Sequence, residues 1–223
     1  MTTIENERRD DGLRQEAAPP RPNRIGVRGV MVSVTVIPGP VATLVPGIQT
    51  ARGQSRRAEC AHHMRHVRIA LHNHAAMFGR FPQATTRDAA GRPVSTWRSD
   101  VAPYLPADPA NVLACPCEDD PNDAVFRAVV RDDFVWREGG SVAIDDVTDG
   151  TSNTIMLVEC CGDTGEMPGE LTFEAFMERF RARDLSCHPG GFHAAMVDGS
   201  TRFLSYDTDP KVLEAMFTIA AED

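Results

Sequence analysis

The sequence lacks the short motifs that mark many enzyme active sites. It contains no Gly-x-Ser-x-Gly nucleophile elbow, no phosphate-binding P-loop and no glycine fingerprint for dinucleotides. Aromatic residues make up only 6% of the chain, which leaves few side chains to line a binding pocket. Basic residues are outnumbered 23 to 32 by acidic ones, and the net charge of −9 disfavours a nucleic-acid-binding protein. We therefore expect a protein that is not an enzyme and has no nucleic-acid partner.

The N-terminal residues do not resemble a standard secretory signal peptide. Residues 1–28 are polar, with mixed charge and a proline-rich stretch, which is typical of a disordered leader. Residues 29–51 carry no charged side chain and are long enough to cross a bilayer. Pro38, Pro40 and Pro46 interrupt this segment, and each proline inside a helix removes a backbone donor and clashes with the preceding turn. Insertion into a membrane and a segment that does not insert both stay open.

One long helix is the clearest element of the first half. Spacings of three and four residues predict an amphipathic helix over residues 54–78 that ends at Gly79. Its expected buried face consists of Cys60, Met64, Val67, Leu71, His74 and Phe78. Residues 79–125 are rich in Pro, Gly, Asp and Ala, so we expect a long irregular connection anchored by Trp97 and by residues 101–105.

The second half has the pattern of short strands. Candidates are residues 125–130, 134–136, 141–144 and 154–158, followed by a helix at 173–183. Residues 192–197 and 201–204 flank Asp198-Gly199, a pair that favours a tight hairpin turn. Asp209-Pro210 is the expected start of a last short helix. The predicted fold is α+β: an N-terminal helix on an antiparallel sheet, a long irregular loop, a C-terminal hairpin and a short helix.

Several short motifs follow one another along the chain. They are Pro46-Gly47-Ile48-Gln49-Thr50-Ala51-Arg52, Leu71-His72-Asn73, Gly79-Arg80-Phe81-Pro82, Cys115-Pro116, Asp149-Gly150-Thr151-Ser152-Asn153-Thr154, His188-Pro189-Gly190-Gly191-Phe192 and Asp198-Gly199. Nine residues separate His188 from Asp198. In this order the motifs resemble a large bacterial family with a prepilin-type N-terminal segment and a C-terminal His-x9-Asp-Gly domain. That family is described as a domain of unknown function and is also labelled as solute-binding.

The resemblance implies a pilin- or pseudopilin-like protein of the cell envelope, with a role in surface structure or secretion-type assembly. It implies a leader at 1–28, a degenerate prepilin-like apolar segment at 29–53 and a pilin-like head at 54–223. The apolar helix would contact protein partners or anchor the chain by a single pass in the inner membrane, with the head outside the cytoplasm. The motif residues carried over are His72, Asn73, Asp149, Gly150, Asn153, His188, Gly190, Gly191, Asp198 and Gly199.

The chain departs from the family at the prepilin peptidase site, because the glutamate of Gly-Phe-Thr-Leu-x-Glu is missing near Val30. Two alternatives therefore stay open beside the pilin-like interpretation. One is a soluble cytoplasmic relic of the family. The other is an envelope solute-binding module, for which Trp97, Tyr104 and Trp136 are the candidate pocket residues.

The sequence has six cysteines: Cys60, Cys115, Cys117, Cys160, Cys161 and Cys187. The resemblance implies a disulfide between Cys60 and Cys115, and free buried thiols are the alternative. Metal ligands are also available in Cys115-x-Cys117, Cys160-Cys161, Cys187-His188 and the group His62, His63 and His66. Only His62 and His66 have a spacing usual for structural zinc, so we expect a solvated histidine-rich helix face and incidental thiols at Cys117, Cys161 and Cys187.

Two further kinds of site receive little support. His188, Asp198, Asp149, Glu159 and Ser152 have residue types found in catalytic triads, but no nucleophile and base can be paired, so no catalytic residue is predicted. Both Asp-Gly pairs are explained by turn chemistry. Asp149 and Asp198 are weak candidates for a Ca²⁺ site where the turns meet, although the spacing is not that of an EF-hand. No other cofactor is expected.

Overall fold

The computed structural model describes residues 39–117, 125–162 and 169–220. The predicted leader and residues 29–38 of the apolar segment lie outside the described residues. From Pro40 onward the chain forms one compact unit. Its elements are α1 (Gly39–Phe78), β1 (Thr85–Arg87), β2 (Pro93–Thr96), α2 (Trp97–Val101), η1 (Ala102–Tyr104), α3 (Pro109–Leu113), β3 (Phe126–Val130), η2 (Ile144–Asp146), β4 (Ile155–Glu159), β5 (Glu170–Thr172), α4 (Phe173–Ala182), β6 (Gly191–Met196), β7 (Thr201–Ser205) and α5 (Pro210–Ala215).

Helix α1 is longer than the sequence predicts. It begins at Gly39, not at residue 54, and continues through Pro46 to Phe78. Pro40 lies in the first turn, where a backbone N–H has no partner in the helix, so it breaks nothing. Pro46 removes one hydrogen bond from a helix of 40 residues, and the remaining bonds and the packing of the second half outweigh that loss. The predicted end is confirmed, because Gly79 has a φ of 76° and donates its N–H to the carbonyl of Ala75.

The buried face of α1 agrees with the prediction over three turns. Cys60, Met64, Val67 and Leu71 are all fully buried. His74 and Phe78 do not follow, because Phe78 is 61% exposed and stacks on the half-buried His74 with ring centroids 4.5 Å apart. Phe81, which is 1% exposed, occupies the core at this end instead.

Five of the described strands form one sheet in the order β5-β3-β4-β6-β7. The pairs β3–β4, β4–β6 and β6–β7 are antiparallel, whereas β3 and β5 run parallel. The predicted strands near 125–130 and 154–158 and the C-terminal hairpin are confirmed. The predictions at 134–136 and 141–144 are wrong, because Phe134 and Trp136 make only isolated bridges and Ile144 begins η2. The α+β class is confirmed.

Residues 79–117 are not the irregular connection that the composition predicts. They form the β1–β2 hairpin, α2, η1 and α3, each of five residues or fewer. Such short elements offer too few positions for a periodic pattern to appear in the sequence. Local capping defines them instead, since the Asp108 side chain accepts a hydrogen bond from the N–H of Asn111 at the start of α3. Trp97 and Val101 are fully buried, as predicted.

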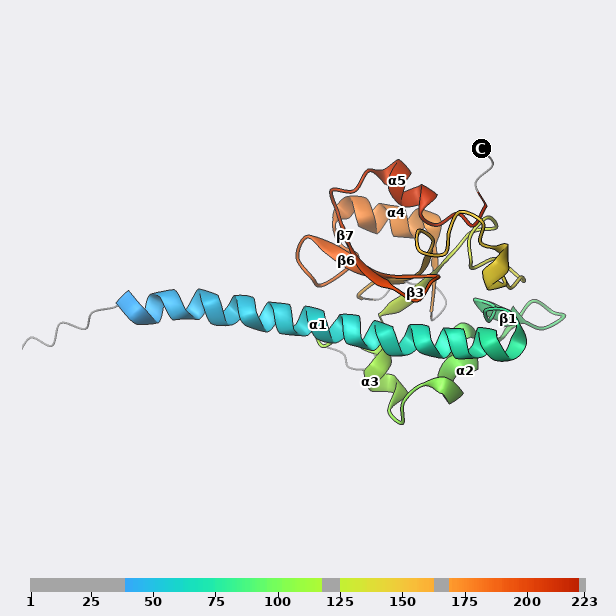
Figure 1. Cartoon of the computed structure of the whole chain (residues 1–223), viewed down its shortest axis with the longest axis horizontal. Coiled ribbons are helices and arrows are strands. Elements are labelled where there is room, and N and C mark those ends of the chain that lie inside the picture. Colours follow the sequence, from blue (N-terminus) through green and yellow to red (C-terminus); the bar gives the residue numbers. More distant parts are fainter. Residues whose placement is uncertain (1–38, 118–124, 163–168, 221–223) are drawn as a thin grey trace, which may run out of the picture. The chain divides into compact units, whose positions relative to one another are not determined.

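The sheet is covered on both faces. Figure 1 shows α1 along one face, and α4 and α5 on the other. One core contains the α1 face together with Phe126, Met156 and Ala195, and the other contains Phe176, Phe192 and Phe217. Burial on both faces explains why β4 reads as a continuous apolar run, Ile155 to Val158, without polar alternation.

The two tryptophans belong to the first core. Trp97 and Trp136 lie with ring centroids 5.9 Å apart, and both are almost fully buried. Their indole N–H groups donate to the backbone carbonyls of Gly169 and Met156. These side chains are therefore core residues, and the expectation that they line a solute pocket is wrong.

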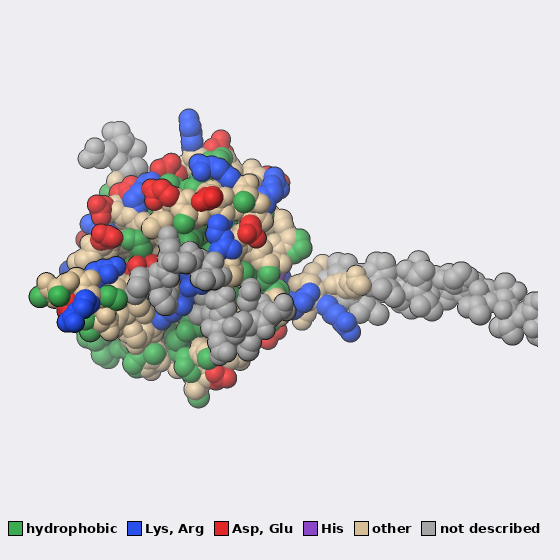
Figure 2. Space-filling view, turned by 180° about the vertical axis from the view of Figure 1, so that it is seen from behind, with side chains coloured by type: hydrophobic (Ala, Val, Ile, Leu, Met, Phe, Trp, Pro, Cys, Tyr) green, Lys and Arg blue, Asp and Glu red, His purple; other side chains and the backbone are tan. Residues whose placement is uncertain are grey.

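The exterior carries charges of both signs. Acidic and basic side chains are interspersed over the face shown in Figure 2. Within the described residues, no helix combines the length and the apolar character needed to cross a bilayer.

Candidate functional site

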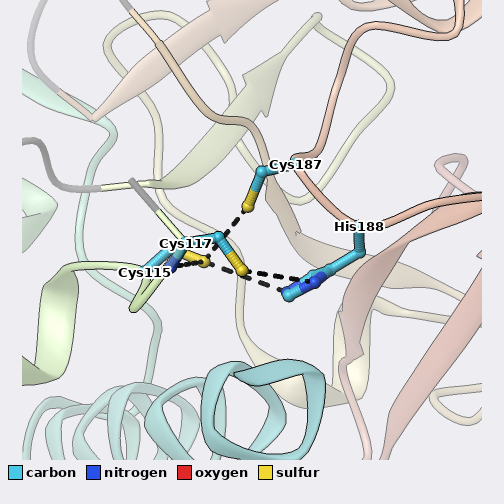
Figure 3. A group of neighbouring side chains, drawn as sticks. All are labelled: Cys115, Cys117, Cys187 and His188. Carbon is cyan, nitrogen blue, oxygen red and sulfur yellow. Dashed lines mark hydrogen bonds between the residues drawn. The ribbon is translucent and has the colours of Figure 1, made fainter. Parts of the chain in front are cut away.

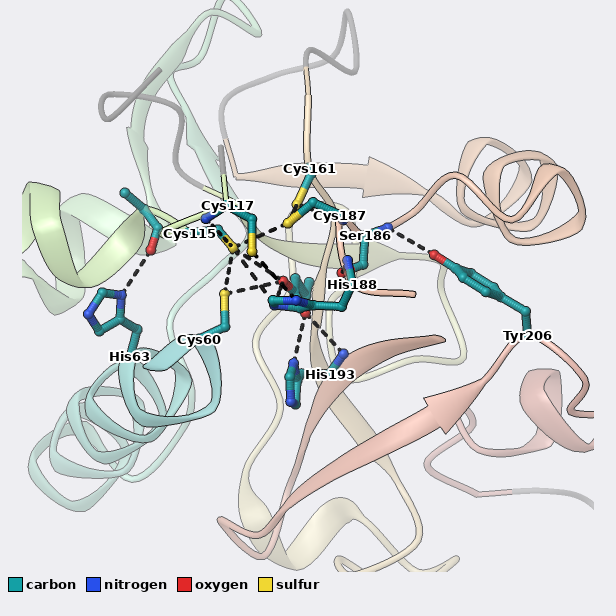
Figure 4. A network of polar contacts seen from close by, with 12 residues as sticks. Cys60, His63, Cys115, Cys117, Cys161, Ser186, Cys187, His188, His193 and Tyr206 are labelled. Carbon is teal, nitrogen blue, oxygen red and sulfur yellow. Dashed lines mark hydrogen bonds and ion pairs between the residues drawn. The ribbon is translucent and has the colours of Figure 1, made fainter. Parts of the chain in front are cut away.

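Five of the six cysteines lie in one cluster together with His188 and His193 (Figure 4). The converging side chains come from α1, the loop after α3, the end of β4 and the residues that follow it, the loop that leads into β6, and β6 itself. They are Cys60, Cys115, Cys117, Glu159, Cys161, Cys187, His188 and His193. Residues between 60 and 193 meet here only because the sheet brings β4 and β6 side by side under the docked half of α1.

Cys115 lies at the centre of the sulfur atoms. Its Sγ is 2.7 Å from the Sγ of Cys60 and 3.4 Å from the Sγ of Cys187. The Sγ of Cys187 in turn lies 3.4 Å from that of Cys161. All these residues are free thiols in the structure. The pair Cys60 and Cys115, which the family resemblance links, is therefore adjacent and unbonded.

Glu159 is a fully buried carboxylate with a donor on every side. Its Oε2 accepts from the backbone N–H of His193 (3.2 Å) and lies 2.9 Å from the Nδ1 of that ring. Its Oε1 lies 3.2 Å from the Sγ of Cys60 and 3.1 Å from the Nε2 of His188. Burial would raise the pKa of Glu159, but the hydrogen bonds with His188 and His193 hold it below the ordinary value. The group is therefore ionised, and its charge is compensated within the core.

The electrostatics concentrate thiolate character on one sulfur. Hydrogen bonds from Cys161, Cys187 and Cys60 lower the pKa of the Cys115 thiol well below its usual range. The same bonds raise the pKa values of Cys60 and Cys187 above theirs. Burial raises the pKa of Cys117 to about 11. A thiolate with neighbouring thiols can bind a metal ion or enter thiol–disulfide exchange.

His188 joins the sulfur atoms to the carboxylate. Its Nδ1 lies 3.6 Å from the Sγ of Cys117, and its Nε2 lies 3.9 Å from the Sγ of Cys115. Burial would lower the pKa of His188, but its contacts with Cys115 and Glu159 raise it to about 9. The ring is therefore placed between two negative groups, which fixes its orientation.

Three overlapping groups of side chains place their ligand atoms within 4.8 Å of one another. Each includes Cys115. The groups are Cys115, Cys117, Cys187 and His188; Cys60, Cys115, Glu159 and His188; and Cys115, Glu159, Cys161 and Cys187. A pocket of about 500 Å³ opens beside the first group and is lined by Cys117, Cys187 and His188 and by residues of α1 that include Arg56 and Arg57.

The histidines of α1 divide between two environments. His62 and His66 lie on the exposed side with their Nε2 atoms 3.0 Å apart. His63 is buried, and its Nδ1 lies 2.9 Å from the carbonyl oxygen of Ala114, so the expectation of a solvated position is wrong for this residue. His63 thus joins α1 to the loop that carries Cys115.

The sequence did not indicate the shared site. The thiols expected to be incidental, Cys117, Cys161 and Cys187, all lie in the cluster, and neither Glu159 nor His193 was considered as a supporting residue. The available signal was the recurrence of close pairs, Cys-x-Cys, Cys-Cys and Cys-His, at three places in the second half of the chain. No single pair had the usual Cys-x2-Cys spacing of zinc sites.

The two Asp-Gly turns meet, as expected, and carry structural contacts. The backbone N–H of Asp198 donates to the carbonyl of Thr151 at 2.9 Å. Asp149 accepts from the Thr218 hydroxyl, and Asp198 accepts from the N–H of Ser200. Neither carboxylate belongs to a group of three or more metal-ligand atoms among the described residues.

The remaining motif residues shape the backbone. Gly150, Gly190 and Gly199 have φ values of 97°, 88° and 81°, a region that favours glycine. A Cβ on Gly191 would lie 2.0 Å from the Leu204 carbonyl oxygen, so this strand position admits only glycine.

Two neighbouring motif residues on α1 differ in role. The Nε2 of His72 lies 2.9 Å from the Val197 carbonyl oxygen, which connects α1 to the β6–β7 hairpin. Asn73 points to solvent, and Asn153 closes its turn by donating its N–H to the Gly150 carbonyl. Folding requirements thus explain most of the motif residues. Among them, His188 is the residue that belongs to the cysteine cluster.

A comparison with protein families gives one match. The model of a family described as "Protein of unknown function (DUF1559)", whose short label marks it as a bacterial solute-binding group, matches residues 49–111 and 177–211. The matched ranges include Cys60, Cys187 and His188 but not Cys115, Cys117 or Glu159. No curated protein and no solved structure matches the chain. Over somewhat less than half of its length, the chain is therefore similar to a family whose function is unknown.

Proposed function

We propose that the chain is a non-enzymatic, pilin-like protein of the bacterial cell envelope that assembles through the first half of α1. The observation that carries this proposal is the unequal packing of α1. The helix has 40 residues, or roughly 60 Å, and among its residues whose side chains are described, those before Cys60 stay outside the core. Residues 51–59 of α1 are exposed or half-exposed, and Figure 1 shows this part of the helix extending past the sheet.

A helix segment of this length needs a partner to be stable. Isolated helices of about 12–15 residues are marginal in water, and most helical stability in proteins comes from packing an apolar face. In the sequence, Val41, Leu44, Val45 and Ile48 recur at spacings of three and four, which places them on one stripe. The partner that fits this stripe is the equivalent helix of other subunits, because identical apolar stripes pack against each other.

The fold and the family match support the same proposal. A long N-terminal helix whose second half covers one face of a sheet is the arrangement that the family resemblance implies. A second candidate, an envelope solute-binding module, is favoured by the family label and by the pocket of about 500 Å³ beside α1. Two arginines of α1, Arg56 and Arg57, line that pocket, so its solute would be a small anion.

Photo-crosslinking in the native host tests the assembly. A benzophenone amino acid at Leu44 should crosslink to a second copy of the chain in the membrane fraction after a carbonate wash. The same probe at Val212, which is exposed on α5, should give no such product and serves as the control. Recovery of the intact chain in the cytoplasmic fraction, without a self-crosslink at Leu44, would contradict the proposal. Stabilisation by a small anion, lost in Arg56→Gln, would favour the second candidate.

A further inference from the structure

We propose that Cys115, Cys117, Cys187 and His188 form a structural zinc site, a property that goes beyond assembly through α1. The four ligand atoms lie within 4.8 Å of one another and face a common centre in Figure 3. Three thiolates and one imidazole are a usual donor set for tetrahedral Zn²⁺. Hard cations such as Ca²⁺ and Mg²⁺ prefer oxygen ligands, so this donor set excludes them.

The distances between ligand atoms fit a tetrahedron around zinc. Zn–S bonds of about 2.3 Å and Zn–N bonds of about 2.0–2.1 Å place two sulfurs about 3.8 Å apart, and a sulfur and a nitrogen about 3.6 Å apart. The Sγ atoms of Cys115 and Cys187 are 3.4 Å apart. The Sγ of Cys117 lies 3.6 Å from the Nδ1 of His188. These two pairs of ligand atoms are therefore already close to the separations that the ion requires, and all four ligand atoms lie within 4.8 Å of one another.

Glu159 identifies the nitrogen of His188 that would bind the ion. Metal-binding histidines usually donate their second N–H to a carboxylate, which fixes the tautomer and the orientation of the ring. The Nε2 of His188 lies 3.1 Å from the Oε1 of Glu159, and His193 holds the other oxygen of that carboxylate. The Nδ1 is left to face Cys117. Glu159 and His193 therefore act as a supporting shell and not as ligands.

The same argument selects this group from the three that overlap. In the other two groups Glu159 would itself be a ligand, although its Oε1 already contacts the Nε2 of His188 and its Oε2 accepts from the backbone N–H of His193. The group that contains Cys60 is also buried throughout. In the proposed group Cys187 is exposed and Cys117 is half-buried on the wall of the pocket, so an ion has an access route.

The site and the disulfide implied for Cys60 and Cys115 exclude each other. Zinc needs the Cys115 sulfur as a thiolate, and a disulfide would consume it. Cys60 then has a different role, since its thiol lies 2.7 Å from the Cys115 sulfur and donates a hydrogen bond to it. Charge-assisted bonds of this kind stabilise a thiolate ligand.

The test uses the full-length chain, purified with a reductant, stripped with a chelator and then loaded with Zn²⁺ or Co²⁺. Elemental analysis should find one zinc per chain, and Co²⁺ should give the thiolate charge-transfer and intense visible bands of a four-coordinate sulfur site. Three variants separate the overlapping groups, because Cys117, Cys60 and Cys161 each occur in only one of them. We expect Cys117→Ala to lower zinc affinity by at least ~100-fold, the upper end of the loss typical for a supporting residue.

The controls are Cys161→Ala, outside the proposed group, and Cys160→Ala, in the other core, and both should keep one zinc per chain at wild-type affinity. Cys60→Ala should also keep one zinc per chain but bind it more weakly, because it removes the hydrogen bond to the Cys115 thiolate. Circular dichroism verifies that each variant is folded, and Cys187→Ser, at an exposed position, repeats the test if Cys117→Ala does not fold. Three results would overturn the proposal: substoichiometric zinc in the reduced wild type, wild-type affinity in Cys117→Ala, or a Cys60–Cys115 disulfide in protein taken from its host without reductant.

Discussion

Replacing Glu159 by glutamine tests whether the buried carboxylate holds the cluster together. The change keeps the volume but replaces one carboxylate oxygen by an amide NH₂. In the wild type, Oε2 has two contacts with His193, and Oε1 contacts Cys60, Cys115 and His188. If the amide oxygen keeps the two contacts with His193, the NH₂ group must face His188 Nε2 and the Cys60 thiol. At least one hydrogen bond of a charged group is then lost, at about 1.5–3 kcal/mol, and a donor is left buried against donors, at about 1–3 kcal/mol.

We therefore expect Glu159→Gln to reduce the free energy of unfolding by about 2.5–6 kcal/mol, which is the range of the two losses taken together. The assay is urea denaturation followed by circular dichroism, with reductant and a chelator present so that neither disulfides nor metal contribute. Glu174→Gln, on the exposed side of α4, is the matched control and should change stability by less than about 0.5 kcal/mol. A loss below about 1 kcal/mol in Glu159→Gln would refute the reasoning, because the carboxylate would then carry no net interaction with its neighbours.

Three other substitutions test the packing around the site by the same denaturation assay. Leu71 is fully buried on α1, so Leu71→Ala should lower the free energy of unfolding by about 2–5 kcal/mol. Ile69 is 42% exposed on the same helix, so Ile69→Ala should lower it by less than about 1 kcal/mol. Equal losses would mean that α1 is not docked as described. Gly191→Ala should prevent folding or cost more than about 3 kcal/mol, since its Cβ meets a backbone carbonyl, while Gly190→Ala should cost about 1 kcal/mol for its positive φ alone. Trp97→Phe removes the indole hydrogen bond to the Gly169 carbonyl, which keeps the Ala128 N–H as a donor, and should cost about 0.5–1.5 kcal/mol; an unchanged midpoint would contradict that role.

The elements that the sequence predicted correctly are those determined by near neighbours. The β6–β7 hairpin follows from Asp198-Gly199, and α5 begins at Asp209 because this side chain accepts from the N–H of Lys211. The docked half of α1 follows from its spacing pattern. Strand β5 was not predicted, because its three residues are positioned by a parallel partner about 40 residues earlier in the chain, and no local pattern encodes that pairing.

The candidate site was missed for the same physical reason. Each cysteine pair is too short a signal to indicate a metal site, and the ligands become neighbours only through tertiary structure. Glu159 ends a fully buried strand, a position where a charged residue is normally excluded. A charged residue at this strand position is unexpected only when both faces of the strand are known to be buried. That knowledge requires the order of the strands in the sheet.

The residues of the cysteine cluster lie far apart in the sequence, and this affects how a newly made chain folds and oxidises. Cys60 and Glu159 are 99 residues apart, Cys115 and Cys187 are 72 apart, and Cys161 and Cys187 only 26. Hairpins such as β6–β7 form in about 1–10 μs, whereas contacts across long loops form later because closing the loop costs more entropy. The thiols therefore remain accessible through most of folding. Closing the 26-residue loop between Cys161 and Cys187 costs less entropy than closing the 55-residue loop between Cys60 and Cys115, by about 0.6 kcal/mol. We therefore expect an oxidant that acts before α1 docks to favour the Cys161–Cys187 pair.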